Sequence, residues 1–157
     1  MSQLFSPLDI GPLPLANRII VAPMCQYSAD AGRASDWHVQ HWGHLALSGA
    51  ALLIAEATAV EPRGRISWGD LGLWDDATEA AFATALATVR RWSPVKMGVQ
   101  LAHAGRKAST HKPWQHAGAA IPPGEPHGWR VVAPSALPFQ PGDPVPEALD
   151  AAGIAAV

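Results

Sequence analysis

The run Ala51–Val60 limits the fold of this chain more than any other stretch. It is apolar throughout except for Glu56 and Thr58. A continuous apolar run of this length predicts a strand that is buried on both faces, which is typical of a parallel sheet covered by helices. Parallel neighbours need long crossover connections, so the residues on either side are expected to hold helices.

Two further apolar runs, Ile19–Ala22 and Val95–Ala102, predict strands on either side of this one. The first connection contains a predicted helix over Trp37–Leu47, capped by Asp36 and followed by Gly49. Its apolar face is expected to contain Trp37, His41, Leu45 and Ala46.

The second connection contains a predicted helix that begins with the capping box Asp76–Glu79 and stops before Pro94. Its apolar stripe is expected to contain Phe82, Ala85, Leu86 and Val89. Strand, helix, strand, helix and strand then make a βαβαβ unit, and the class is α/β. The strand spacing fits a (β/α) barrel or a doubly wound sheet. No Gly-x-Gly-x-x-Gly follows the first strand, which disfavours a dinucleotide-binding sheet.

The flanking segments differ from this unit. Residues 1–18 predict an N-terminal hairpin or cap, and residues 104–146 predict one long proline-rich loop. A last helix is expected to start within Pro146–Asp150 and continue over 151–157. Because a complete barrel needs about 250 residues, residues 1–157 are expected to be the N-terminal portion of one barrel domain, with about the first three strands and the long loop.

Composition excludes several classes of function. The net charge is −2 with scattered basic residues, which argues against nucleic-acid partners. No apolar run approaches the ~20 residues of a membrane helix, and the N-terminus lacks a signal-peptide pattern. The single cysteine excludes an intrachain disulfide and fits the cytoplasm. His38, His41 and His44 spread over too wide an arc of a helix for one metal site, so no metal is expected.

The carboxyl ends of the three predicted strands present Pro23–Tyr27, Glu56–Thr58 and Gln100–Lys107. In a barrel these ends form the active site. They contain amides, a thiol, a phenol and cations, but no carboxylate pair for glycoside hydrolysis and no serine elbow. Such a set suits the binding of a planar, hydrogen-bonding cofactor. His103 is expected at the edge of this site.

Four segments resemble the Old Yellow Enzyme family: Asn17–Arg18, Ala22–Tyr27, Glu56–Val60 and Gln100–Lys107. The resemblance is closest to its bacterial branch with a cysteine near the flavin, the xenobiotic-reductase and thermophilic-like ene-reductases. It implies a (β/α)8 TIM barrel that holds FMN. It also implies an oxidoreductase in which NADPH or NADH reduces FMN, and the flavin reduces the C=C bond of an α,β-unsaturated carbonyl.

The resemblance also implies roles for individual residues. Cys25 and Tyr27 are the implied catalytic residues: the thiol hydrogen-bonds to the flavin and tunes its potential, and the phenol belongs to the substrate pocket. The Gln100 amide matches the pyrimidine edge of the flavin, because it both donates and accepts. The implied cofactor-binding residues are Pro23, Met24, Cys25, Ala57 and Gln100. The family's substrate-gripping and phosphate-binding residues follow later strands.

Other readings remain open at this point. The chain is expected to act on a small-molecule alkene, as a homo-oligomer or with a companion chain that completes the barrel. A dienoyl-CoA-reductase-like flavin barrel is an alternative of the same fold. A non-catalytic half-barrel that needs a partner chain is an alternative of another class. A plain βαβ binding module does not explain Cys25, Tyr27 and Gln100 together.

Overall fold

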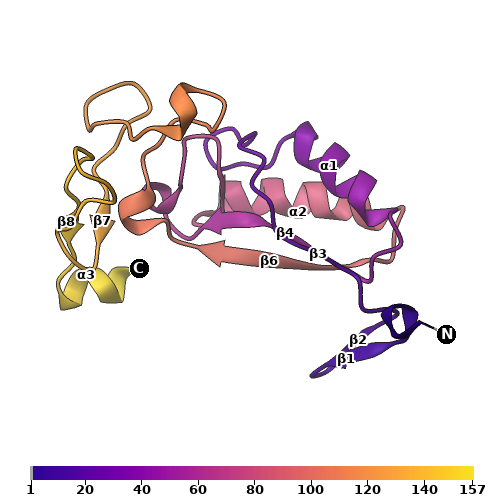
Figure 1. Cartoon of the computed structure of the whole chain (residues 1–157). Coiled ribbons are helices and arrows are strands. Elements are labelled where there is room, and N and C mark those ends of the chain that lie inside the picture. The colour runs from indigo at the N-terminus through magenta and orange to yellow at the C-terminus, as the bar shows by residue number, and fades with distance from the viewer. Residues whose placement is uncertain (1) are drawn as a thin grey trace.

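A computed structural model describes residues 2–157 and contains a parallel sheet at its centre (Figure 1). Strand β4 (Leu52–Ala59) is the middle strand of this sheet. β3 (Ile20–Val21) pairs with its first residues, and β6 (Lys96–Ala102) pairs along its whole length on the other side. The short β5 (Leu71–Gly72) pairs with the end of β4. All four strands are parallel, as the apolar runs predict, and β4 is buried along most of its length.

Two helices pack on one side of this sheet, α1 (Asp36–Ala46) and α2 (Asp76–Arg90) (Figure 1). They enclose one core with the sheet, in which α1 contributes Trp42, β4 contributes Leu53 and Ala55, and α2 contributes Ala85 and Val89. The order β3, α1, β4, α2, β6 is the predicted βαβαβ unit. The fold is therefore the α/β arrangement expected for the first part of a TIM barrel, and residues 2–157 alone do not close a barrel.

The N-cap of each helix lies one residue before the predicted one. Ser35, not Asp36, is the N-cap of α1, and Asp36 lies in the first turn. In α2 the Asp75 carboxylate accepts a hydrogen bond from the Thr78 N–H at 2.8 Å. The capping box therefore joins Asp75 to Thr78, and the predicted pair of Asp76 and Glu79 is wrong. The capping residue must be extended, and Asp75 is extended, with φ −153°.

The buried face of α1 also differs from the prediction. The structure buries His38, Trp42 and Ala46, whereas Trp37 stays 47% exposed. The large Trp42 ring decides this orientation, because it packs against Phe82 of α2 with ring centroids 4.9 Å apart. The predicted stripe of α2 is confirmed at Ala85 and Val89, which are buried.

Residues outside the unit form short elements. The hairpin expected near the N-terminus is present as β1 (Leu8–Ile10) and β2 (Leu13–Leu15). A last helix is present as α3 (Ala151–Ala156), but Glu147 and Ala148 are not its first turn, because they form β8, a strand parallel to β7. The remaining elements are η1 (Gln3–Phe5), η2 (Pro62–Gly64), η3 (Gly105–Lys107), η4 (His116–Gly118), β7 (Val132–Ala133) and β8 (Glu147–Ala148).

Strand β6 leaves Val99 37% and Leu101 62% exposed, so apolar side chains of this edge strand face outward. Among the helices of residues 2–157, none has the length and apolar character that a bilayer crossing requires.

Candidate functional site

The segment after β3 carries the first candidate residues and is held by backbone and side-chain hydrogen bonds. The Gln26 N–H donates to Oε1 of Glu56 at 3.0 Å, which ties this segment to β4. The Gln26 amide donates to the Met24 carbonyl at 2.9 Å and accepts from the Trp37 indole N–H at 3.1 Å. Gln26 therefore has its polar groups occupied by the protein and serves to hold Met24 and Cys25 in place.

The end of β4 lies beside the end of β6 in the sheet. Ala57 is the register partner of Gln100, and the register shifts by one residue between Ala55 and Ala57. This shift leaves Glu56 as the extra residue of a β-bulge, which redirects its side chain. The structure thus brings the predicted site residues Ala57 and Gln100 next to each other, with Gln100 exposed at the strand end.

Cys25 lies close to both strand ends and is half-buried. Burial is the main cause that raises the pKa of its thiol to about 11, and the Asp70 and Glu56 carboxylates act in the same direction. A backbone hydrogen bond from Ala57 opposes them. The side chain is therefore a neutral thiol near pH 7, and a thiol is able to donate a hydrogen bond to a ligand.

Tyr27 lies at the mouth of a hollow bordered by the segment after β6. Its backbone is left-handed, with φ 53°, and its ring meets the Trp114 ring edge to face with centroids 5.7 Å apart. Burial raises the pKa of its phenol, and the neighbouring Cys25 adds to the rise. The hollow measures about 580 Å³ and includes Lys107 and Phe139 in its lining. Tyr27 is one of the residues that line this hollow, and its role in a substrate pocket stays a prediction.

The predicted site residues gather at the carboxyl ends of β3, β4 and β6. Pro23 is half-buried, and Met24 is 58% exposed. Cys25 has Ala57 as a neighbour, and Ala57 pairs with Gln100. Together they make one continuous wall that is accessible from outside. Their roles toward a cofactor stay predictions, because geometry alone places them without showing what they bind.

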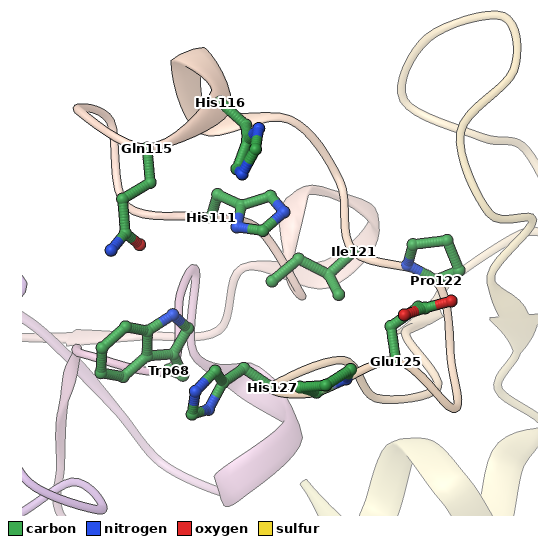
Figure 2. Close-up of a pocket in the computed structure, with 9 residues that line it drawn as sticks. Trp68, His111, Gln115, His116, Ile121, Pro122, Glu125 and His127 are labelled. Carbon is green, nitrogen blue, oxygen red and sulfur yellow. The ribbon is translucent and has the colours of Figure 1, made fainter.

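A second hollow, of about 650 Å³, lies between Trp68 in the loop before β5 and the long segment after β6 (Figure 2). The His127 ring stacks on the Trp68 ring with centroids 4.4 Å apart, and the His111 and His116 rings lie above them at the same distance from each other. Cys25 is not part of its lining. In residues 2–157, His, Cys, Asp and Glu side chains form no group of three or more suited to a metal ion.

Several buried polar residues near the site received no individual role from the sequence, although Glu56 lies in one of the predicted strand-end segments. Glu56 and His38 are 2% and 0% exposed, and Asp70 is 2% exposed beneath the same loops. The Asp70 carboxylate accepts hydrogen bonds from the Ile66 N–H and the Ser67 hydroxyl, at 2.8 and 2.9 Å. A glutamate inside the apolar run 51–60 was the available signal, because a carboxyl group is almost never buried without partners.

His103, predicted at the edge of the site, instead joins two strand ends. Its Nε2 atom lies 2.8 Å from Oε1 of Glu61, and its Nδ1 atom accepts from the Gly105 N–H at 3.0 Å. Both ring nitrogens are therefore used within the protein. His103 supports the connection between β4 and β6 and has no free nitrogen for a ligand.

Comparison with known sequences finds one family model along most of the chain. Residues 3–135 match the NADH:flavin oxidoreductase / NADH oxidase family. An NADH:flavin oxidoreductase of Gibberella zeae is 41% identical over 150 residues, which cover 94% of this chain and 36% of that protein. An NADPH dehydrogenase of Geobacillus thermodenitrificans is 39% identical over 153 residues, which cover 96% of this chain and 40% of that protein. The chain thus spans about two fifths of the length of these relatives.

Solved structures share the same arrangement. Morphinone reductase superposes with a TM-score of 0.76 at 30% identity, over 98% of this chain and 41% of that one. The old yellow enzyme from Trypanosoma cruzi superposes with a TM-score of 0.75 at 26% identity, over 98% of this chain and 44% of that one. The described sheet and helices therefore correspond to less than half of each of these enzymes.

Proposed function

The chain belongs to the NADH:flavin oxidoreductase / NADH oxidase family, which is the Old Yellow Enzyme family, and from this premise we propose that it provides one wall of an FMN site for ene reduction. The observation that carries the proposal is the register of β4 and β6. It places the Gln100 amide beside Ala57, next to the half-buried Cys25 thiol. A thiol donor and an amide at one edge suit a planar ring with carbonyl acceptors and an N–H donor.

The residues of the wall would hold FMN in distinct ways. Gln100 would pair with the pyrimidine edge of the ring, while Pro23, Met24 and Ala57 would pack against its face. When bound, FMN supplies hydride transfer between NADPH or NADH and an activated alkene. Cys25 would donate a hydrogen bond to the ring and favour the negative charge that reduction adds there. Tyr27 would border the space of the substrate, because it lines the hollow that also contains Lys107.

The pair of Cys25 and Tyr27 favours the branch of xenobiotic-reductase and thermophilic-like ene-reductases. A cytoplasmic place of action fits a chain whose only cysteine is a free thiol. We also propose that further polypeptide covers β6, from a companion chain or another copy. The exposed Val99 and Leu101 support this.

A visible spectrum tests the proposal. The purified chain is incubated with FMN, separated from free flavin by gel filtration, and its spectrum is recorded. We expect retained flavin bands that NADPH bleaches and cyclohexenone restores. Protein that retains no flavin overturns the proposal for this chain and favours a non-catalytic half-barrel.

A matched pair of variants then locates the flavin. Gln100→Leu is expected to weaken FMN retention, because the hydrogen-bonding amide at the strand end is lost. Gln40→Leu is the control, since Gln40 is an exposed residue of α1 on the other side of the sheet. Equal retention by both variants would remove Gln100 from the site.

A further inference from the structure

The buried pair of His38 and Glu56 has no role in the wall described so far. Nε2 of His38 lies 3.7 Å from Oε2 of Glu56, and the side chains are 0% and 1% exposed. Among the described residues neither of these two atoms has a hydrogen-bond partner. Each buried polar group without a partner destabilises a fold, so two facing each other need an explanation.

The protonation of His38 follows from its other nitrogen. The backbone N–H of Ser35 donates to Nδ1 at 3.0 Å, and a backbone N–H is always a donor. Nδ1 is therefore unprotonated, and the neutral imidazole carries its proton on Nε2. Burial, with some repulsion from His41, lowers the pKa of His38 to about 4, so the ring is neutral near pH 7. Nε2 then carries the only proton of the ring, and it is this nitrogen that lies 3.7 Å from Oε2 of Glu56.

The Glu56 carboxyl group receives a second donor from the wall of the site. Its Oε1 atom accepts the Gln26 N–H at 3.0 Å, and Gln26 directly follows Cys25. A protonated Glu56 would set an O–H donor on Oε2 against the Nε2–H donor of His38. The ionised form instead accepts the Gln26 N–H and faces Nε2 of His38 at 3.7 Å without a clash of donors. The Gln26 hydrogen bond opposes burial, which raises the pKa of Glu56 to about 7.

The β-bulge explains how a glutamate reaches this position. The register of β4 shifts at Glu56, so its side chain turns toward α1, the side on which Leu53 and Ala55 pack. A regular strand would alternate faces and point residue 56 away from Ala55. The bulge, α1 and the segment after β3 thus meet at one carboxylate.

We propose that Glu56 is a positioning residue: its buried carboxylate, held between His38 and the Gln26 backbone, fixes the segment that carries Cys25 and adds to burial and to Asp70 in disfavouring the thiolate form of this side chain. The groups that face Glu56 are His38 from α1, Asp70 from the loop before β5, and Cys25 itself. A fixed negative charge beside the thiol disfavours a second negative charge on sulfur.

The meaning of this arrangement for FMN rests on the proposed function, but the thiol can be measured without flavin. A neutral thiol donates to a ring that becomes negative on reduction, whereas a thiolate would repel it. Since Cys25 is the only cysteine, alkylation of the full chain reports on this site alone. Failure of FMN binding and failure of the present inference therefore show in different experiments.

The test compares iodoacetamide alkylation of Glu56→Gln with that of the unaltered chain at a pH above 8, where Glu56 is ionised. We expect alkylation about two- to fivefold faster in Glu56→Gln, because a lower thiol pKa gives more thiolate. Glu61→Gln is the matched control: it removes a carboxylate that also faces a histidine but does not contact the Cys25 segment. Equal rates in Glu56→Gln and the unaltered chain overturn the proposal.

A measurement on the unaltered chain remains decisive if Glu56→Gln fails to fold, as judged by near-UV circular dichroism. Nitrogen-15 NMR of the imidazole rings distinguishes the two tautomers. We expect His38 to carry its proton on Nε2 with Nδ1 unprotonated. A proton on Nδ1 would leave an unprotonated Nε2 facing the Glu56 carboxylate and overturn the inference.

Discussion

Nε2 of His103 lies 2.8 Å from Oε1 of Glu61, across the carboxyl ends of β6 and β4. Arg63 donates to the same oxygen atom at 2.7 Å. The Nδ1 atom of His103 accepts from a backbone N–H, so Nε2 carries the donated proton. His103 and His38 therefore have the same tautomer. Each of the two pairs joins a glutamate, Glu56 in β4 or Glu61 just after β4, to another element.

The Glu61 pair predicts a stability that depends on pH. Burial alone would raise the pKa of Glu61, but the hydrogen bonds from Arg63 and His103 outweigh it, so the pKa lies below its ordinary 4.5. A carboxyl group with a lowered pKa stabilises the fold above the pKa of the unfolded chain, and this contribution is lost as the pH falls through the folded value.

We therefore expect Glu61→Gln to lower the free energy of unfolding by about 1 kcal/mol near neutral pH, because the hydrogen bonds lose their charged acceptor. The difference should shrink as the pH falls below 4.5 and through the lowered pKa of the folded state, because the native carboxyl group then becomes protonated. Urea denaturation at both pH values measures it. A difference that does not change with pH would show that the charge contributes nothing.

The Cys25 thiol predicts a change of the flavin potential in the assembled site. Cys25→Ala removes a donor that favours the added negative charge, so the potential should fall by about 10–30 mV for the loss of one neutral hydrogen bond. Cys25→Ser keeps a donor and should shift it less. Spectroelectrochemical titration measures both, and an unchanged potential in Cys25→Ala removes this role.

Much of the fold can be predicted from local sequence patterns, without knowing which strand or helix lies beside them. The apolar run at Ala51–Val60 predicts a buried parallel strand, because any sheet that accepts it must cover both faces. The helix caps were placed one residue late. Ser35 and Asp75 each precede another residue that can cap, and only the backbone conformation distinguishes them.

The site was harder to predict where it depends on register. Cys25 and Gln100 lie at strand ends, so their place follows from the strands alone. The role of Glu56 arises from a bulge, and a bulge exists only relative to the neighbouring strand β6. The sequence does not place His38 beside Glu56 either, since the burial of His38 depends on how Trp42 orients α1.

Trp42 is expected to be the most costly single truncation in the core. It is 1% exposed and contacts both His38 and Phe82 with its ring. Trp42→Ala should lower the free energy of unfolding by about 3–5 kcal/mol, because it leaves a large cavity between α1 and α2. Trp92→Ala is the matched control, since Trp92 is 78% exposed and should change stability by less than about 0.5 kcal/mol.

One substitution, glycine to alanine, should act in opposite directions at two positions. At Gly72 of β5 an added Cβ would overlap the body of the Trp74 ring, which also lies against Gly32. The Arg65 guanidinium lies over the Trp74 indole, 5.4 Å from the ring centroid. The rigid indole therefore has to move as a unit to make room. Gly72→Ala should therefore destabilise the chain by about 1–3 kcal/mol.

Gly43 in the middle of α1 offers the opposite case. An added Cβ there meets no heavy atom within 4 Å, and the backbone is already helical. Gly43→Ala should raise the free energy of unfolding by about 0.5–1 kcal/mol, because alanine loses less conformational entropy in a helix. Thermal and urea denaturation of both variants measure the effects. A stabilised Gly72→Ala variant would show that Trp74 is free to leave β5, and the packing of this edge would then need to be revised.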